Sequence, residues 1–228
     1  MNIKQIACQS NTFIISTEDT APGYVRLISY GHTTPQLREW CIQQGRNRFM
    51  LSNKLFKEYW LSNFPVVASI HGPCITDRNE SIDHAFCFRC TSWIQQAQPW
   101  IQRKREWPSP NLIYKIQNCG VLFVAIGCKN SPNEDIEWRV SFSVAEKQLI
   151  FSFSHTQLLC YALMKILLKE VVNLHQSCND LLCSYFMKTV MLWASEELPV
   201  EIWKPENIIF CFQCVIQKLI YFIKFENL

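Results

Sequence analysis

A charged and hydroxyl-bearing segment, Glu137–Lys147, is the part of this sequence best suited to chemistry. Apolar and polar residues alternate along it, with Trp138, Val140 and Phe142 at the apolar positions. This period of two predicts a strand with one apolar and one polar face. The polar positions, continued into a following helix, are Arg139, Ser141, Ser143 and Glu146. We expect them to line a cleft; the alternative is a half-buried strand that leads into a surface helix.

The residues before this segment predict a mixed α/β lobe. Strand-like runs occur at 12–16, 24–29, 82–90 and 121–128, and residues 53–61 have a helical pattern. Ser109 can cap a helix that has Pro110 at its first position and Gly120 just past its end.

The residues after it predict a helical lobe. Ser154 and Gln157 have the spacing of a capping box, and Pro205 with Glu206 opens the last helix. The sequence therefore predicts an α+β protein, with an α/β lobe over residues 1–142 and an all-helical lobe over residues 143–228. We expect a cleft where the two meet.

Composition limits the class of protein. With 228 residues, 49% of them hydrophobic, the chain can bury a core in one or two lobes. Its net charge of +3 is too small to indicate nucleic-acid binding by itself. The 12 cysteines are scattered through apolar segments, and the first 15 residues lack the apolar core of a signal peptide. We expect reduced thiols and an intracellular protein of the cytoplasm or nucleus.

Two C-x-x-C pairs raise the question of zinc. Cys87 and Cys90 lie in a predicted strand, where positions three apart point to opposite faces, and Cys211 and Cys214 also lie in regular structure. We expect no zinc site. The longest apolar run, residues 208–225, is interrupted by glutamines and lysines and is interpreted as a core helix, not a membrane span.

The segment W-R-x-S-F-S-x-x-E-K at 138–147 resembles the signature of the Mab-21 family, which includes the metazoan cyclic GMP–AMP synthases. Further landmarks resemble the family in the same order: Pro22–Leu27, His71–Pro73, Ser81–Asp83, Trp107–Ser109, Leu163–Lys165, Ser184–Thr189 and Trp203. The resemblance implies a nucleotidyltransferase-type mixed sheet followed by a helical domain of the HhH/H2TH type. It also implies that full-length relatives join nucleoside triphosphates into cyclic dinucleotides in innate immune sensing.

Catalysis in this family uses three carboxylates that hold Mg²⁺ or Mn²⁺ ions. By resemblance, Asp83 matches the third carboxylate, as both metal ligand and catalytic residue. The first two, which follow a Gly-Ser loop, have no match, and Asn2–Ile6 is similar to the strand just downstream of them. We therefore expect an N-terminally truncated member that is catalytically incomplete and does not bind these metals stably.

The resemblance assigns nucleotide contacts on the other side of the cleft. Arg139, Ser141, Ser143 and Glu146 match residues at the base, and Lys165 and Ser184 match phosphate contacts. Tyr185 matches an aromatic residue that stacks on a base. The alternatives are a solvated lysine at Lys165 and a core tyrosine at Tyr185.

A basic cluster, Arg103–Arg105, lies between two tryptophans. It could contact nucleic-acid phosphates, in keeping with double-stranded nucleic acid or another ligand as an activator in the family. A solvated helix face is the alternative. Two functions stay open: a cyclic GMP–AMP synthase-like protein that binds ATP or GTP, and a non-catalytic Mab-21-like regulator that acts through its helical lobe.

Overall fold

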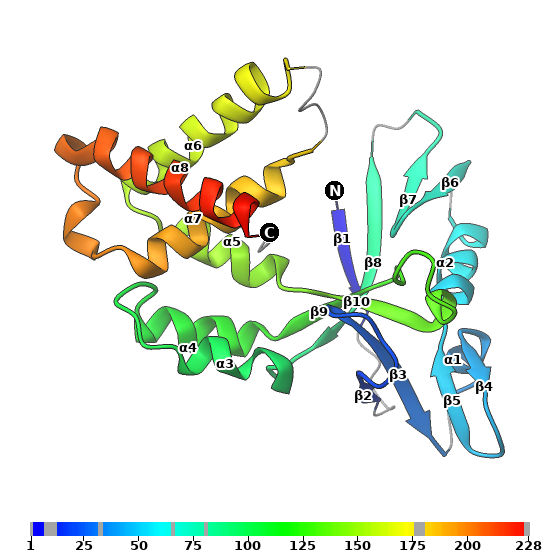
Figure 1. Ribbon diagram of the computed structural model, residues 1–228. Helices are drawn as coiled ribbons and strands as arrows, with labels where there is room; N and C mark the ends of the chain where they lie inside the picture. The colour runs from blue at the N-terminus through cyan, green and yellow to red at the C-terminus, as the bar shows by residue number, and fades with distance from the viewer. Residues whose placement is uncertain are drawn as a thin grey trace. The chain divides into compact units, whose positions relative to one another are not determined.

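The computed structural model of the chain describes residues 2–6, 13–31, 34–64, 67–79, 82–175 and 181–225. They divide into two units, which Figure 1 shows as a sheet with short helices and a group of helices. The first unit comprises Met1–Ile94 and Asn118–Ser143, and the second Gln95–Gln117 and Val144–Leu228. The chain thus passes from the first unit to the second one residue after the predicted boundary, and the segment 95–117 packs with the helices.

The first unit is built on one mixed sheet. Its strands run in the order β4 (Cys41–Gln43), β5 (Arg48–Leu51), β3 (Tyr24–Tyr30), β10 (Glu137–Ser141), β9 (Val121–Val124), β8 (Asp83–Cys90), β7 (Cys74–Asp77) and β6 (Ala68–His71). The pairs along this order are antiparallel. In addition, β2 (Ile14–Ser16) pairs with β3, and β1 (Asn2–Ile6) pairs with β8 in parallel.

Strand β1 is bonded along one side only. Its partner is β8, from Asn2 opposite His84 to Ile6 opposite Phe88, and no strand of the described ranges pairs with its other side. Within the described ranges, β1 therefore leaves one side of its backbone unpaired, as at a sheet edge.

Aromatic side chains cover one face of the sheet beneath α1 (Pro35–Glu39) and α2 (Asn53–Ser62). The ring of Phe56 from α2 lies 5.3 Å from that of Trp138, and Trp60 stacks on Phe86 at 4.4 Å. Trp138 and Phe56 are fully buried. Phe88 lies 5.4 Å from Trp138, so this face is the apolar face predicted for the segment 137–147.

Hydrogen bonds tie the start of β10 to the start of α2. The Trp138 indole donates to the Leu51 carbonyl at 2.9 Å. The Asn53 amide donates to the carbonyls of Glu134 and Glu137, at 2.5 and 2.8 Å. All three contacts join residues more than 80 positions apart in sequence. They fix β10 against the helix layer.

The second unit is helical. Its helices are α3 (Gln98–Gln102), α4 (Pro110–Cys119), α5 (Ser143–Phe151), α6 (His155–Leu167), α7 (Ser184–Glu197) and α8 (Ile208–Lys224), with a π-helical turn at Leu168–Val172. The last two residues of α4 and the first residue of α5 belong to the first unit. Short 3₁₀ turns at Gln95–Ala97, Val200–Ile202 and Pro205–Asn207 connect them, and a further one at Glu134–Ile136 precedes β10 in the first unit. The core combines residues of α6, α7 and α8, among them Cys160, Met164, Met187, Val190, Met191, Cys211 and Val215.

The signals predicted for α6 and α4 are confirmed, whereas Pro205 and Glu206 lie in a 3₁₀ turn and α8 begins at Ile208. Ser154 and Gln157 form a capping box at the start of α6. Gly120 follows α4 with a φ of +66°, and a Cβ on it would lie 1.9 Å from the Cys90 carbonyl oxygen. Only glycine fits there, because both the left-handed backbone and the close approach exclude a side chain.

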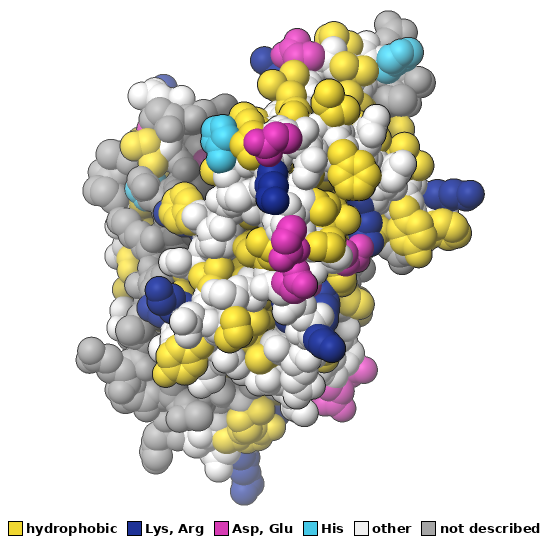
Figure 2. Space-filling model, turned by 90° about the vertical axis from the view of Figure 1, so that its left-hand side faces the viewer, with side chains coloured by type: hydrophobic (Ala, Val, Ile, Leu, Met, Phe, Trp, Pro, Cys, Tyr) yellow, Lys and Arg dark blue, Asp and Glu magenta, His cyan; other side chains and the backbone are white. Residues whose placement is uncertain are grey.

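Helix α8 buries one face only. Val215 and Leu219 are in the core, whereas Ile209 is 73% exposed. Pro205–Lys224 is long and apolar enough to cross a membrane by length and composition, with 22% of that window buried. One face of α8 therefore packs in the core, as predicted for a core helix, and the opposite face is exposed. Figure 2 shows apolar side chains lying among charged ones on the side of the molecule that it faces.

We predict that Asn53→Ala lowers the free energy of unfolding by about 1–3 kcal/mol, because two carbonyls lose their donor. Urea unfolding followed by circular dichroism measures this. Asn47→Ala is the matched control: Asn47 is exposed in the same unit, so its change should stay within about 0.5 kcal/mol. Equal midpoints for the two variants would contradict the role of Asn53.

Candidate functional site

Arg139 and Asp83 lie on the same face of the sheet. Arg139 pairs with Val124, and Val124 with Cys87, so these three side chains share a face. Asp83 is two alternations before Cys87 on β8 and points the same way. This face is opposite to the one that holds Trp138, as the alternation along the segment predicted.

The charges of Asp83 and Arg139 both act on one thiol. Burial raises the pKa of Cys74, the Asp83 carboxylate raises it further, and Arg139 lowers it. Cys74 pairs with Ala85 on β8, between Asp83 and Cys87. The first unit therefore brings the predicted metal ligand and the predicted base contact to one surface.

The carboxylate of Asp83 is exposed, and it accepts a hydrogen bond from the Thr76 hydroxyl at 2.7 Å. Within the described ranges, no three His, Cys, Asp or Glu side chains gather where they could hold a metal ion. Two divalent cations need several carboxylate oxygens at once. The described residues therefore do not fit the two-metal centre of a nucleotidyltransferase.

Ser141 and Ser143 mark the change from strand to helix. The Ser143 N–H donates to the Ser141 hydroxyl at 3.3 Å. The Ser143 hydroxyl is buried and has no hydrogen-bond partner in the described part of the chain. Glu137, at the start of the polar face, is fully buried instead of lining a surface. Its carboxylate accepts from the Cys128 N–H at 2.8 Å and the Ser131 hydroxyl at 2.7 Å, so it holds the loop before β10.

In the second unit, three predicted residues belong to one patch. Glu146 of α5 pairs with Lys188 of α7, with Nζ and Oε2 2.5 Å apart. Lys188 also lies 4.9 Å from the centre of the Tyr185 ring. Lys165 of α6 lies 5.6 Å from the centre of the Tyr161 ring. We call Glu146, Tyr161, Lys165, Tyr185 and Lys188 the tyrosine–lysine patch.

Tyr161 joins the two halves of the patch. Burial raises its pKa, the Lys188 ammonium lowers it and the Glu146 carboxylate raises it. Both charges therefore act on the Tyr161 hydroxyl, while Lys165 lies beside the ring. Tyr185 is 56% exposed, so the alternative of a core tyrosine is wrong. Ser184 is exposed one position before it, as the first residue of α7.

Lys188 and Tyr161 were not among the predicted site residues. Lys188 follows Tyr185 by three positions on a helix, and Tyr161 precedes Lys165 by four. These spacings place the side chains on one helix face. The spacing was therefore a usable signal within each helix, but the link from Lys188 to Glu146 joins two helices 42 residues apart.

The basic cluster 103–105 is not a solvated helix face. Helix α3 ends at Gln102, and Arg103 and Arg105 both pair with Glu196, at 2.7 and 2.9 Å. Of the three basic residues, only Lys104 has no ion pair in the described part of the chain. The alternative of a solvated helix face is wrong, because the Glu196 carboxylate, 91 residues after Arg105, neutralises part of the charge of the cluster.

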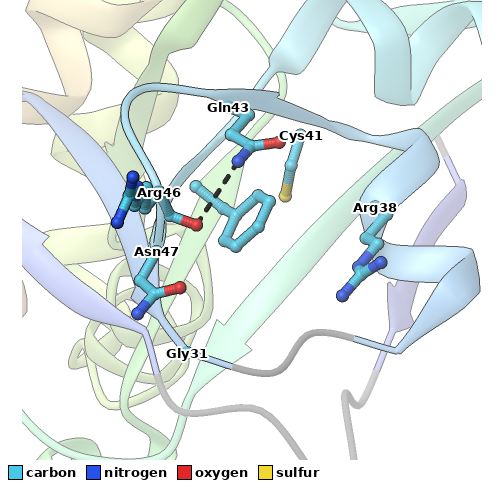
Figure 3. Close-up of a pocket in the computed structure, with 7 residues that line it drawn as sticks. Gly31, Arg38, Cys41, Gln43, Arg46 and Asn47 are labelled. Atoms are coloured by element: carbon cyan, nitrogen blue, oxygen red, sulfur yellow. Dashed lines mark hydrogen bonds between the residues drawn. The ribbon is translucent and has the colours of Figure 1, made fainter.

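The first unit contains a cavity of about 370 Å³ at the β4–β5 hairpin (Figure 3). Arg38, Cys41, Gln43 and Asn47 line it, and the Gln43 amide is fixed by the Gly45 and Arg46 carbonyls. No predicted site residue lines this cavity.

Two family models match the chain. The model of the Mab-21 protein nucleotidyltransferase domain matches residues 69–152. The model of the Mab-21 protein HhH/H2TH-like domain matches residues 157–228.

We predict that the Glu146–Lys188 pair couples α5 to α7 by about 1 kcal/mol, because both side chains are three-quarters buried or more. A double-mutant cycle with Glu146→Gln and Lys188→Met, followed by urea unfolding, measures this coupling. The exposed pair Lys169–Glu170 is the control, and the coupling free energy from its double-mutant cycle should be near zero. Equal coupling in both cycles would contradict the prediction.

Proposed function

Because the chain belongs to the Mab-21 family, we propose that it binds a nucleoside triphosphate through the tyrosine–lysine patch. The observation that carries the proposal is the exposed ring of Tyr185 beside the Lys188 ammonium. An aromatic ring that is open to solvent offers a base a stacking face, and a neighbouring ammonium suits a phosphate.

The remaining contacts are proposed from the family resemblance. Arg139 offers a rigid fork of donors to a base edge, and the hydroxyls of Ser141 and Ser143 add donors at the turn into α5. Ser184 and Lys165 contact phosphates in this proposal. What supports it is that Ser184 and Lys165 are exposed and that the Ser143 hydroxyl lacks a partner among the described residues.

The charge of the patch limits its affinity. Two lysines and one glutamate give it a net charge of +1, and Glu146 already neutralises much of Lys188. One stacked base and one charge contact contribute roughly 1–3 kcal/mol each. We therefore propose a weak site, with a dissociation constant on the order of 0.1–1 mM.

We further propose a protein of the cyclic GMP–AMP synthase-like class that does not complete the transfer reaction as this chain stands. In relatives that carry all three carboxylates, Mg²⁺ or Mn²⁺ would activate the attacking hydroxyl and neutralise the triphosphate. Asp83 supports the proposal as the single matched carboxylate. A regulator that binds nucleotide without transfer is the second candidate, favoured by the lack of a metal-holding group among the described residues.

We predict that Tyr185→Ala weakens the binding of ATP or GTP about tenfold or more, because stacking is lost. Tyr114→Ala should leave binding unchanged, since Tyr114 is 66% exposed on α4 and lies outside the patch. Charge variants should act in opposite directions: Lys188→Gln weakens binding, whereas Glu146→Gln strengthens it by removing a negative charge. Titration calorimetry measures all four, and equal affinity in the Tyr185 and Tyr114 variants would refute the patch.

We predict no dinucleotide product when the chain is incubated with ATP, GTP and Mg²⁺ or Mn²⁺, with or without double-stranded nucleic acid. The reason is that Asp83 alone cannot organise two cations. Mass spectrometry of the reaction tests this. A product that disappears in Asp83→Asn would show that other acids complete the centre, and it would overturn the proposal of incomplete catalysis while leaving nucleotide binding intact.

A further inference from the structure

A buried ion cluster joins segment 95–117 to α7 within the second unit. The Glu196 carboxylate accepts from Arg103 Nη1 at 2.7 Å, Arg105 Nη1 at 2.9 Å and the Trp100 indole at 2.7 Å. Its side chain is 7% exposed, and that of Arg105 is 2% exposed. The cluster is therefore a built structure with fixed geometry, and not a pair of surface contacts.

The cluster contains one cation more than it has anions. Two guanidinium groups share one carboxylate, which leaves a net charge of +1. Arg105 Nη2 is buried without a hydrogen-bond partner among the described residues. Burial lowers the pKa of Arg105, Glu196 raises it, and the neighbouring Arg103 lowers it. A second anion close to the cluster would offset both the repulsion and the cost of burial.

A cavity of about 460 Å³ opens at this cluster. Arg103, Lys104 and Arg105 line its charged side, and Trp193, Leu198 and Pro199 line its apolar side. The Arg103 guanidinium lies 4.3 Å from the centre of the Trp193 ring, so its orientation is fixed by stacking as well as by Glu196. Its side chain is 37% exposed, which leaves donors accessible from the cavity.

Two further acidic residues line the cavity. Glu197 accepts from the Lys218 ammonium at 2.5 and 2.6 Å, which neutralises it. Glu106 accepts from the Val200 N–H at 3.2 Å and keeps its negative charge at the exposed end of the segment. Lys104 is exposed and has no ion pair among the described residues. The accessible cations are therefore Lys104 and Arg103, and Arg103 shares the single Glu196 carboxylate with Arg105.

We propose that this cavity binds a small molecule in which an oxyanion, phosphate or carboxylate, is joined to an apolar group. The oxyanion contacts Lys104 and Arg103, and the apolar group lies against Trp193, Leu198 and Pro199. A fixed guanidinium and a lysine suit an oxyanion, and the apolar wall adds contact area. No residue of the tyrosine–lysine patch lines this cavity, so the site is additional to the proposed nucleotide site.

Nuclear magnetic resonance of the ¹⁵N-labelled full chain tests the proposal through the indole N–H signals of Trp193 and Trp100. The Trp193 signal is assigned with Trp193→Phe. The probes are phenyl phosphate, benzoate and inorganic phosphate. We expect phenyl phosphate or benzoate to shift both indole signals, with a dissociation constant in the millimolar range. Tighter binding of phenyl phosphate identifies a phosphate ligand, and tighter binding of benzoate identifies a carboxylate.

Charge variants decide whether the cavity is the site. Lys104→Gln should weaken binding about tenfold, because one charge-assisted contact is lost. Lys115→Gln, an exposed lysine on α4, is the matched control and should bind like the unmodified chain. Four results would each overturn the proposal. The first two are equal binding by these two variants and no shift of either indole signal. The others are inorganic phosphate bound as tightly as the ring-bearing probes, and weaker binding in Tyr185→Ala.

Discussion

The first unit depends on the anchoring of the start of β10 against the start of α2. Trp138 fills the aromatic layer and donates to the Leu51 carbonyl. The Asn53 amide donates to the carbonyls of Glu134 and Glu137, at the two ends of the turn that precedes β10. Glu137 is fully buried because two donors of the adjacent loop satisfy its carboxylate. A buried polar group is tolerated only with such partners. These contacts fix the direction of β10, and with it the face on which Arg139 lies.

In the second unit, helix α7 contributes residues to both proposed binding sites. Its first turns supply Tyr185 and Lys188 to the tyrosine–lysine patch, and its last turn supplies Glu196 to the buried ion cluster. Eleven residues at 1.5 Å per residue separate Tyr185 from Glu196 along the helix, or about 17 Å. Val190 and Met191 between them are fully buried. One rigid, well-packed helix therefore carries both proposed binding sites and keeps them apart.

The two units differ in what they offer a ligand. The second unit has paired cations beside exposed or stacked aromatic rings, which suits bases and oxyanions. On the face of the sheet that holds Arg139, the first unit offers the exposed carboxylate of Asp83, which accepts from the Thr76 hydroxyl. Binding needs only a few fixed donors, whereas two-metal transfer needs several carboxylates at one point. This difference is why we propose nucleotide binding for the chain without a completed transfer reaction.

The sequence by itself determined the local structure. Alternation placed Trp138 and Arg139 on opposite faces, the Ser154–Gln157 spacing placed the start of α6, and Gly120 marked the end of α4. The family resemblance could be read from ordered motifs because each is short and contiguous. Only the tertiary structure decided which charges meet: Glu146 with Lys188, and Arg105 with Glu196. Capping and alternation involve neighbours whose geometry the backbone fixes, whereas an ion pair between distant residues exists only once packing has brought two segments of the chain together.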